Sequence, residues 1–185
     1  GAWVFNVGMD YQMATLSVDQ TFPSSFSDSR NFYNILRSLS INTRLNMFSN
    51  LRFSYRTSTN QPTITQLQNV IDNSNPLQIS TGNPGLGQEF SHNFNAHYGT
   101  FNMVTAAAFF SMINFSVTEN KIITATTVVT GEGDSITLDG RRVWLPSGAQ
   151  FSRPINLNGA MNASAFVVYS FPWEPISGLK LNVNT

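Results

Sequence analysis

Three arginines in this sequence are spaced so that their charged groups share one surface. Arg44, Arg52 and Arg56 alternate with apolar residues over two neighbouring segments. In a sheet with one wet and one apolar face, this spacing puts all three guanidinium groups on the wet face. There they could pair with another segment or steer an anionic solute, or they could form salt bridges that rigidify the wall, which is the commoner role. These arginines are the candidate residues of a water-filled interior.

A second candidate group lies in a polar stretch near the C-terminal third. Trp144 follows Arg141 and Arg142 there. An aromatic ring beside two guanidinium groups could contact a ligand such as a sugar or a peptide. The same tryptophan could instead pack between two loops. Both interpretations stay open on the sequence alone.

Residues for catalysis or metal binding do not form a recognisable set. His92 and His97 have opposite strand phase and cannot share a face, and the chain has no cysteine for a zinc-thiolate site. Glu132 and Asp134 in a glycine-rich turn supply too few oxygen ligands for calcium. Neither a nucleophile-elbow sequence nor a phosphate-binding glycine motif is present. We therefore expect no enzymatic activity, no metal and no cofactor.

Composition favours a sheet between water and an apolar medium. Only 11% of the 185 residues are charged, whereas soluble domains average about 25%. Ten basic and ten acidic residues give no net charge, which argues against a nucleic-acid partner. Aromatic residues make up 12%, and no stretch approaches the roughly 20 apolar residues of a membrane helix. A transmembrane β-barrel and a secreted β-sandwich both fit these values.

Period-2 alternation of apolar residues predicts the strands. The first strand carries an apolar face of aromatic and aliphatic residues, namely Trp3, Phe5, Val7, Met9, Tyr11 and Met13. Residues 50–93 read as a strand, a long polar excursion and a second strand. The same pattern recurs to the end of the chain and gives about seven strands. Such strands would be long enough to cross the apolar band of an outer membrane.

The connections between the predicted strands alternate in length. Long polar connections cover residues 17–30, 59–88 and 119–157, and short turns separate them. Within the second, Thr63 and Gln66 resemble a capping box that opens a short helix to about residue 71. The third is expected to contain one hairpin, residues 122–129 with 135–144, closed at 131–134. Long loops on one side and tight turns on the other are typical of outer-membrane barrels.

Three stretches carry a family resemblance: NLRFSYRTSTNQPTITQLQ, NSNPLQISTGNPGLGQEFSHN and FSRPINLNG. They resemble the β-barrel region of TonB-dependent receptors, in particular the branch with a carboxypeptidase-regulatory-like domain before the plug. The resemblance covers nearly the whole chain. It implies a bacterial outer-membrane receptor with a barrel of about 22 strands, a plug inside it, and uptake driven by an inner-membrane energy-coupling complex.

We therefore predict an all-β, antiparallel up-and-down meander that forms part of a transmembrane β-barrel. Residues 1–185 would be a barrel fragment whose partners are outer-membrane lipid, the plug and the remaining strands. Arg44, Arg52 and Arg56 would then face the lumen. The predicted function is solute uptake, with capture by the outer loops. The alternative is a soluble β-rich surface module for adhesion or glycan binding, in which the apolar face of the first strand is buried in a protein core.

Overall fold

Seven long strands form one antiparallel sheet in the structure, a computed structural model that describes residues 2–21, 25–138, 141–176 and 179–184. The order is β1-β2-β3-β6-β7-β12-β13, so each strand lies beside the next long strand along the chain. Their bounds are β1 Trp3–Gln20, β2 Phe26–Asn46, β3 Ser49–Asn60, β6 Glu89–Asn102, β7 Ala107–Glu119, β12 Ala160–Ile176 and β13 Leu179–Asn184. The predicted all-β antiparallel meander is confirmed. The sheet is open, as expected for part of a barrel.

Cross-strand register keeps all apolar faces on one side of this sheet. Val7 lies opposite Leu39, which lies opposite Tyr55, and the row continues through Phe94 and Phe115. Side chains alternate between the two sides along each strand. One such row therefore determines on which side of the sheet each remaining residue of these strands lies. The predicted strand phases therefore combine into a continuous apolar surface.

The apolar side of β1 is not covered by any other layer of the described chain. Its six alternating apolar residues are between 56% and 82% exposed. A soluble sheet protein would bury such a face, whereas a membrane barrel turns it toward lipid. In β7, residues 109–117 rise roughly 20 Å along the membrane normal at the usual strand tilt, close to an apolar band of about 25 Å. No helix in the described ranges is long and apolar enough to span a bilayer.

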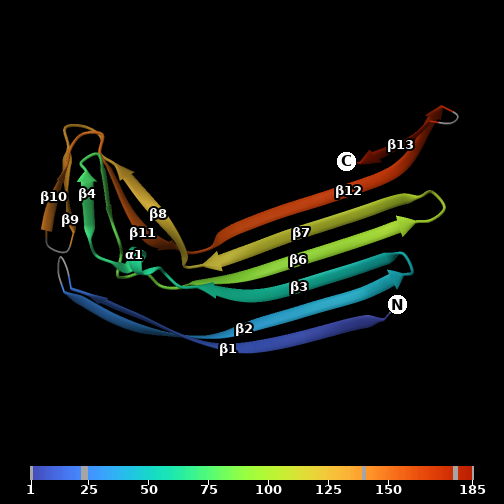
Figure 1. The fold of residues 1–185 in the computed structure, drawn as a ribbon, viewed down its shortest axis with the longest axis horizontal. Coiled ribbons are helices and arrows are strands. Elements are labelled where there is room, and N and C mark those ends of the chain that lie inside the picture. Colours follow the sequence, from blue (N-terminus) through green and yellow to red (C-terminus); the bar gives the residue numbers. More distant parts are fainter. Residues whose placement is uncertain (1, 22–24, 139–140, 177–178, 185) are drawn as a thin grey trace.

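Long and short connections lie at opposite ends of the sheet (Figure 1). Residues 47–48 and 103–106 form tight turns at one end. At the other end, the first connection is shorter than predicted: residues 17–20 and 26–30 are strand, so the loop predicted over 17–30 is corrected to an extended β1–β2 hairpin. Polar cross-strand pairs hold this extension, such as the Ser27 hydroxyl donating to Asp19 at 2.7 Å.

The two longer excursions fold together into a small body that we call the outer module. It contains a four-stranded sheet of β4 (Ile71–Asn75), β5 (Gln78–Thr81), β11 (Gln150–Leu157) and β8 (Lys121–Val128), and the hairpin β9 (Asp134–Leu138) with β10 (Arg141–Leu145). Figure 1 shows it at the end of the sheet that carries the long connections. Ile79, Val129, Leu145 and Ala149 form its buried core.

The hairpin predicted over residues 122–144 is wrong in its pairing. β8 pairs with β11, and β9 pairs with β10. β8 has its antiparallel partner in β11 over Lys121–Val128, so residues 129–133 lead into the separate β9–β10 hairpin instead of closing a turn between β8 and β9. The capping box is present, with Thr63 and Gln66 bonding to each other's backbone, but the helix α1 (Ile64–Leu67) ends before residue 71.

Candidate functional site on the polar side of the sheet

The side of the sheet opposite the apolar surface is polar across nearly its full width. One cross-strand row contains only asparagine and serine: Asn6, Ser40, Ser54, Asn95, Asn114 and Ser164. Asn6 Nδ2 donates to Ser40 Oγ at 3.0 Å, and Asn114 Nδ2 donates to Ser164 Oγ at 3.2 Å. Uncharged hydrogen-bonding groups in this number suit a hydrated interior.

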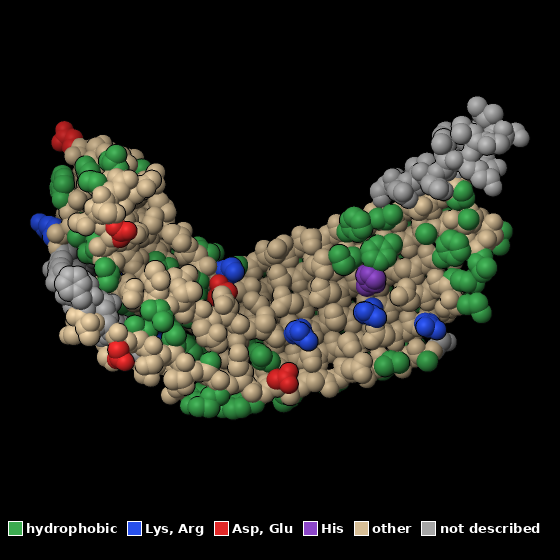
Figure 2. All heavy atoms as spheres, in the orientation of Figure 1, with side chains coloured by type: hydrophobic (Ala, Val, Ile, Leu, Met, Phe, Trp, Pro, Cys, Tyr) green, Lys and Arg blue, Asp and Glu red, His purple; other side chains and the backbone are tan. Residues whose placement is uncertain are grey.

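The three candidate arginines all lie on this polar side, as their spacing predicts. Arg44 belongs to β2, whereas Arg52 and Arg56 belong to β3, and all three are exposed. Figure 2 shows basic side chains along this face of the sheet, with a histidine beside them. In the described part of the chain, no carboxylate forms an ion pair with any of them. Among the described side chains, these three arginines therefore form none of the salt bridges that would rigidify the wall.

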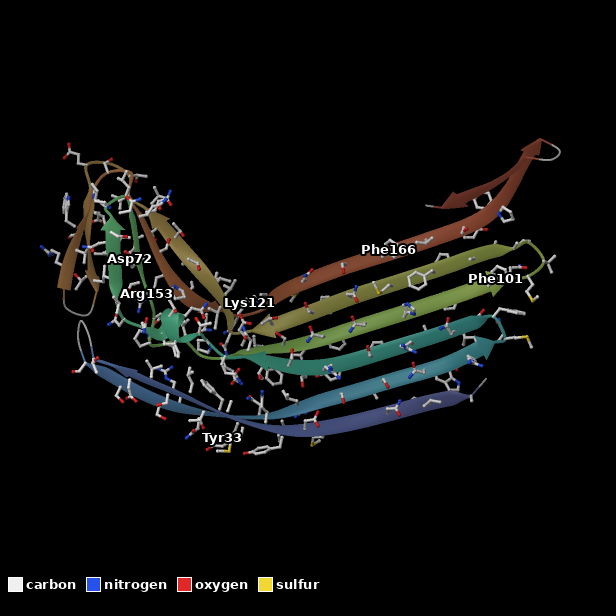
Figure 3. All side chains as sticks on the ribbon, in the orientation of Figure 1. Tyr33, Asp72, Phe101, Lys121, Arg153 and Phe166 are labelled. Atoms are coloured by element: carbon white, nitrogen blue, oxygen red, sulfur yellow. The ribbon has the colours of Figure 1, made fainter. Side chains whose placement is uncertain are left out.

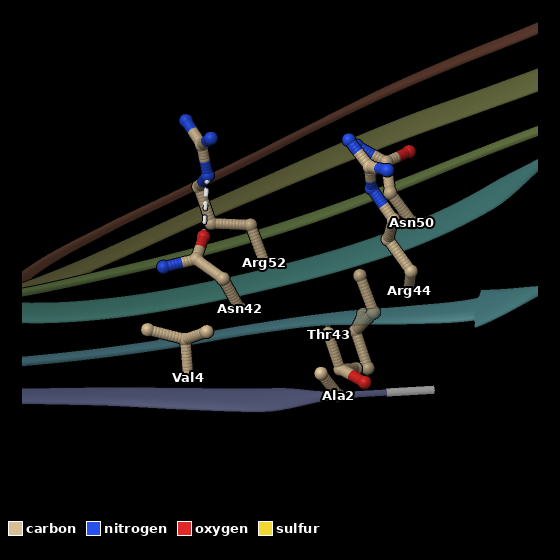
Figure 4. Close-up of a pocket in the computed structure, with 8 residues that line it drawn as sticks. Ala2, Val4, Asn42, Thr43, Arg44, Asn50 and Arg52 are labelled. Carbon is tan, nitrogen blue, oxygen red and sulfur yellow. Dashed lines mark hydrogen bonds between the residues drawn. The ribbon is translucent and has the colours of Figure 1, made fainter.

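Two of the arginines border a cavity of about 430 Å³ near the turn end of the sheet. Asn42 lies opposite Arg52, and Arg44 lies opposite Asn50, so the two arginines are diagonal neighbours on adjacent strands. Arg52 Nε donates to Asn42 Oδ1 at 2.7 Å. Figure 4 shows both guanidinium groups on the same side of the sheet, together with the Asn42 and Asn50 side chains. Val4 of the edge strand lies at the cavity's border.

An aromatic group lies on the same side and was not predicted as part of a site. His97 is directly opposite Arg52, and its ring meets Phe110 edge-on with 4.5 Å between centroids. Phe110 in turn lies 6.3 Å from Phe166, which Figure 3 labels on β12. The sequence could have indicated this group, because Phe110 and Phe166 occupy positions in their strands that alternate with the apolar-side residues.

Arg37, His92 and Glu119 place polar and charged groups in the outer part of the apolar side, and we call them the outer rim. Arg37 is level with Thr57, whose hydroxyl accepts from the Arg37 backbone N–H at 2.7 Å. His92 Nδ1 hydrogen-bonds the Tyr55 hydroxyl at 2.9 Å, and its Nε2 lies 4.0 Å from Glu119. Charged groups at this level can reach the headgroups, so the membrane-spanning part extends from the rim to the turns.

The second predicted site lies on the outer module, and the structure describes the side chains of two of its three residues. Trp144 is 64% exposed and Arg142 is also exposed on the same face of β10. The Arg141 side chain lies outside the described residues. The Trp144 ring packs over Gly133, where an added Cβ would come within 2.7 Å of Cζ2. No other loop of the described chain covers it, so the structure favours a surface role over packing between loops.

The sequence did not predict a polar cleft of about 380 Å³ in the outer module. The cleft lies on the face of the four-stranded sheet opposite the module's core. Hydroxyl and amide groups border it, together with the carboxylate of Asp72, which Figure 3 labels on β4. The Ser74 side chain and backbone both donate to Asp72, and these hydrogen bonds lower the pKa of Asp72. No local sequence pattern could predict this cleft, because the pairing of β5 with β11 brings together residues about seventy positions apart.

Glu89 joins the outer module to the long sheet. Its carboxylate accepts from the Ile122 backbone at 2.7 Å and from Asn60 at 3.1 Å, and it lies 3.4 Å from Lys121 Nζ. Arg30 adds a second link by donating to the carbonyl groups of Leu86 and Pro84. The module is thus fixed to β2, β3 and β6 by partly buried polar contacts.

Metal ligands do not gather anywhere in the described ranges: no group of three or more histidine, aspartate or glutamate side chains could hold an ion. The remaining candidates for chemistry are the arginine cavity, the exposed Trp144 face and the polar cleft. All three are suited to binding.

Comparison with known proteins gives one family and several solved structures, among them two receptors. The model of the "Outer membrane protein beta-barrel family" matches residues 1–185. The hemophore receptor HasR of Serratia marcescens, solved as a double mutant with its hemophore HasA and heme, aligns with a TM-score of 0.51 at 12% identity over 93% of this chain. The siderophore receptor PirA of Acinetobacter baumannii aligns with a TM-score of 0.49 at 15% identity over 94%. The chain spans 28% and 26% of these two chains, and no curated protein matches it.

Proposed function

The chain belongs to the outer membrane protein beta-barrel family, and on that premise we propose that it forms part of the wall of a receptor for solute uptake. Its place is the bacterial outer membrane, as predicted from the sequence. The resemblance to TonB-dependent receptors is confirmed at the level of the fold by the alignment with HasR. The alternative of a soluble surface module is not supported, because the apolar face of β1 is uncovered and the family is one of outer-membrane barrels.

The observation that carries the proposal is the separation of the two sides of the sheet. One side is mainly apolar and is exposed along β1, and the other has asparagine, serine and arginine in register. A wall of this kind separates lipid from a hydrated passage. The outer module, fixed above the passage by Glu89 and Arg30, presents an exposed tryptophan and a polar cleft.

In the proposed mechanism, a solute first binds to the outer module. A plug inside the complete barrel then moves, driven by an energy-coupling complex of the inner membrane, and the solute passes along the polar wall. The plug and the remaining strands would come from the parts of the receptor that this chain does not include. The wall residues bind and guide, and no bond of the solute is broken.

The test compares a strain that lacks the full-length receptor with the same strain carrying it on a plasmid. Haem, a ferric siderophore and a malto-oligosaccharide are supplied as labelled solutes. We expect accumulation of one of them to fall to the background level without the receptor, and to require the proton gradient. Equal accumulation of all three in both strains, or accumulation that survives collapse of the gradient, contradicts the proposal.

A further inference from the structure

We propose that Arg44 and Arg52 form a binding site for a carboxylate group on the lumen wall. The two guanidinium groups border the same cavity of about 430 Å³, with Asn42 and Asn50 between them. This inference rests on the proposed function only in that the polar side of the sheet faces a lumen. It adds a ligand chemistry that uptake by itself does not imply.

The geometry favours an anion held by two arginines at once. Arg44 and Arg52 are diagonal neighbours on adjacent strands, a relationship in which Cα atoms are about 7–8 Å apart and long side chains can reach a common point. Both groups rise from the sheet on the same side in Figure 4. A carboxylate placed between them could accept two N–H bonds from each fork.

One of the two guanidinium groups is already oriented by the protein. Arg52 Nε donates to Asn42 Oδ1 at 2.7 Å, which leaves the terminal Nη groups to point toward a ligand. Asn50, opposite Arg44, adds an amide that can donate to the same oxygen atoms. Holding a donor in place before binding reduces the entropy cost of the contact.

Charge supports the same ligand class. Arg52 lies between the apolar-side residues Leu51 and Phe53 in sequence, and Arg44 lies close to the turn at residues 47–48. In the described part of the wall, neither has a carboxylate within ion-pair distance. Two neighbouring guanidinium groups without a carboxylate partner attract an anion to the space between them. His97 and Phe110 beside the cavity add a ring surface on which a solute could rest.

A carboxylate could come from two sources: a solute in the lumen, or an aspartate or glutamate of a protein segment that enters it. The experiment separates them by chemical protection of arginine. The full-length receptor in detergent micelles is treated with phenylglyoxal, with and without citrate, and modification of Arg44, Arg52 and Arg56 is quantified by mass spectrometry. Arg56 is the matched control, because it is exposed on the same side and the same strand as Arg52 but does not border the cavity.

We expect Arg44 and Arg52 to react about tenfold more slowly than Arg56 when the site is filled, the size expected for loss of one charge-assisted contact. Protection only with citrate identifies a solute carboxylate. A cysteine introduced by Val4→Cys, tested with a neutral maleimide, reports whether the cavity is open. If the arginines are protected without citrate and this cysteine still reacts, the bound group is a protein carboxylate. Both results support the site.

Equal reactivity of all three arginines in both conditions overturns the proposal. So does protection without citrate in which the cysteine of Val4→Cys is also blocked, because the wall is then covered without a specific contact. Where protection depends on citrate, a further check is citrate affinity: R44Q/R52Q should lose about tenfold or more, whereas R56Q should stay within about twofold. These readouts need no uptake, so failure of the site and failure of the transport function are distinguishable.

Discussion

Glu89 and Lys121 lie 3.4 Å apart where the long sheet meets the outer module, and they belong to different parts of the fold. The Glu89 side chain is 7% exposed, and its second oxygen accepts from Asn60. Figure 3 labels Lys121 at this junction. A buried carboxylate with three partners from two bodies holds the module in one orientation, because each partner would be left unsatisfied if the bodies separated.

Replacement of this carboxylate is predicted to loosen the junction. Glu89→Gln removes the charge that pairs with Lys121 and weakens the bond from the Ile122 N–H. We expect a loss of about 1–3 kcal/mol in the stability of the outer module, the usual cost of a broken charged hydrogen bond in a buried place. Hydrogen exchange of β8 and β11 amides in detergent measures it. Glu119→Gln is the control, since Glu119 is 62% exposed and lies 4.0 Å from His92; an equal effect of both changes would contradict the prediction.

The same carboxylate predicts a pH dependence. Burial raises the pKa of Glu89, but the Ile122 N–H, the Asn60 amide and the Lys121 ammonium together outweigh it, so the pKa lies below the ordinary 4.5. The folded state then binds the proton less readily than the unfolded state, and the stabilisation is present above the ordinary pKa and lost as the pH falls through the folded one. Exchange protection of β8 should drop between about pH 5 and pH 3 in the wild type but not in Glu89→Gln. A parallel drop in both proteins would assign the effect to other groups.

Neighbouring residues on β7 test which side of the sheet faces lipid. Ile113 is on the apolar side and 52% exposed, and Asn114 is on the polar side, where it donates to Ser164. Ile113→Arg places a charge near the middle of the membrane and should cost about 2–4 kcal/mol, whereas Asn114→Arg should cost about 1 kcal/mol or less. The folded fraction of the full-length receptor in lipid vesicles, read as heat-modifiable gel mobility over a urea series, measures both. A larger loss for Asn114→Arg would invert the assignment of the two sides.

Period-2 alternation made the membrane-spanning strands predictable, because each has one side in lipid and the other in water. Trp3 to Met13 shows this best, and the structure keeps every residue of that face on one side. Beyond Met13 that face continues with Thr15, Ser17 and Asp19, so the apolar alternation ends there. Residues 17–20 and 26–30 therefore read as a loop, although Ser27 Oγ donates to Asp19 at 2.7 Å across a regular hairpin.

The outer module could not be derived from local pattern. β8 and β11 pair across more than twenty residues, and β5 joins β11 from another excursion. Such contacts are selected by the shared core around Ile79 and Leu145, which no short-range signal specifies. The arginine site could be predicted only in part. The alternation of residues along each strand predicted that Arg44 and Arg52 lie on the polar side. That the two are diagonal neighbours follows only from the register between β2 and β3.

Two glycines before β9 give the last prediction, on how Trp144 is presented. Gly131 and Gly133 both have φ in the left-handed range, 98° and 114°, so alanine is strained at either position by about 1 kcal/mol or more. They differ in surroundings: a Cβ at Gly131 meets nothing within 4 Å, whereas one at Gly133 meets Trp144 Cζ2 at 2.7 Å and the Leu145 carbonyl oxygen at 3.0 Å. Gly133→Ala should therefore displace the indole as well as strain the backbone, and Gly131→Ala should only strain it. Iodide quenching of the Trp144 fluorescence, read as the difference from a Trp144→Phe background, should change in Gly133→Ala and stay constant in Gly131→Ala. Identical quenching in the two variants would mean that Gly133 does not support the ring, and that its role is confined to the turn.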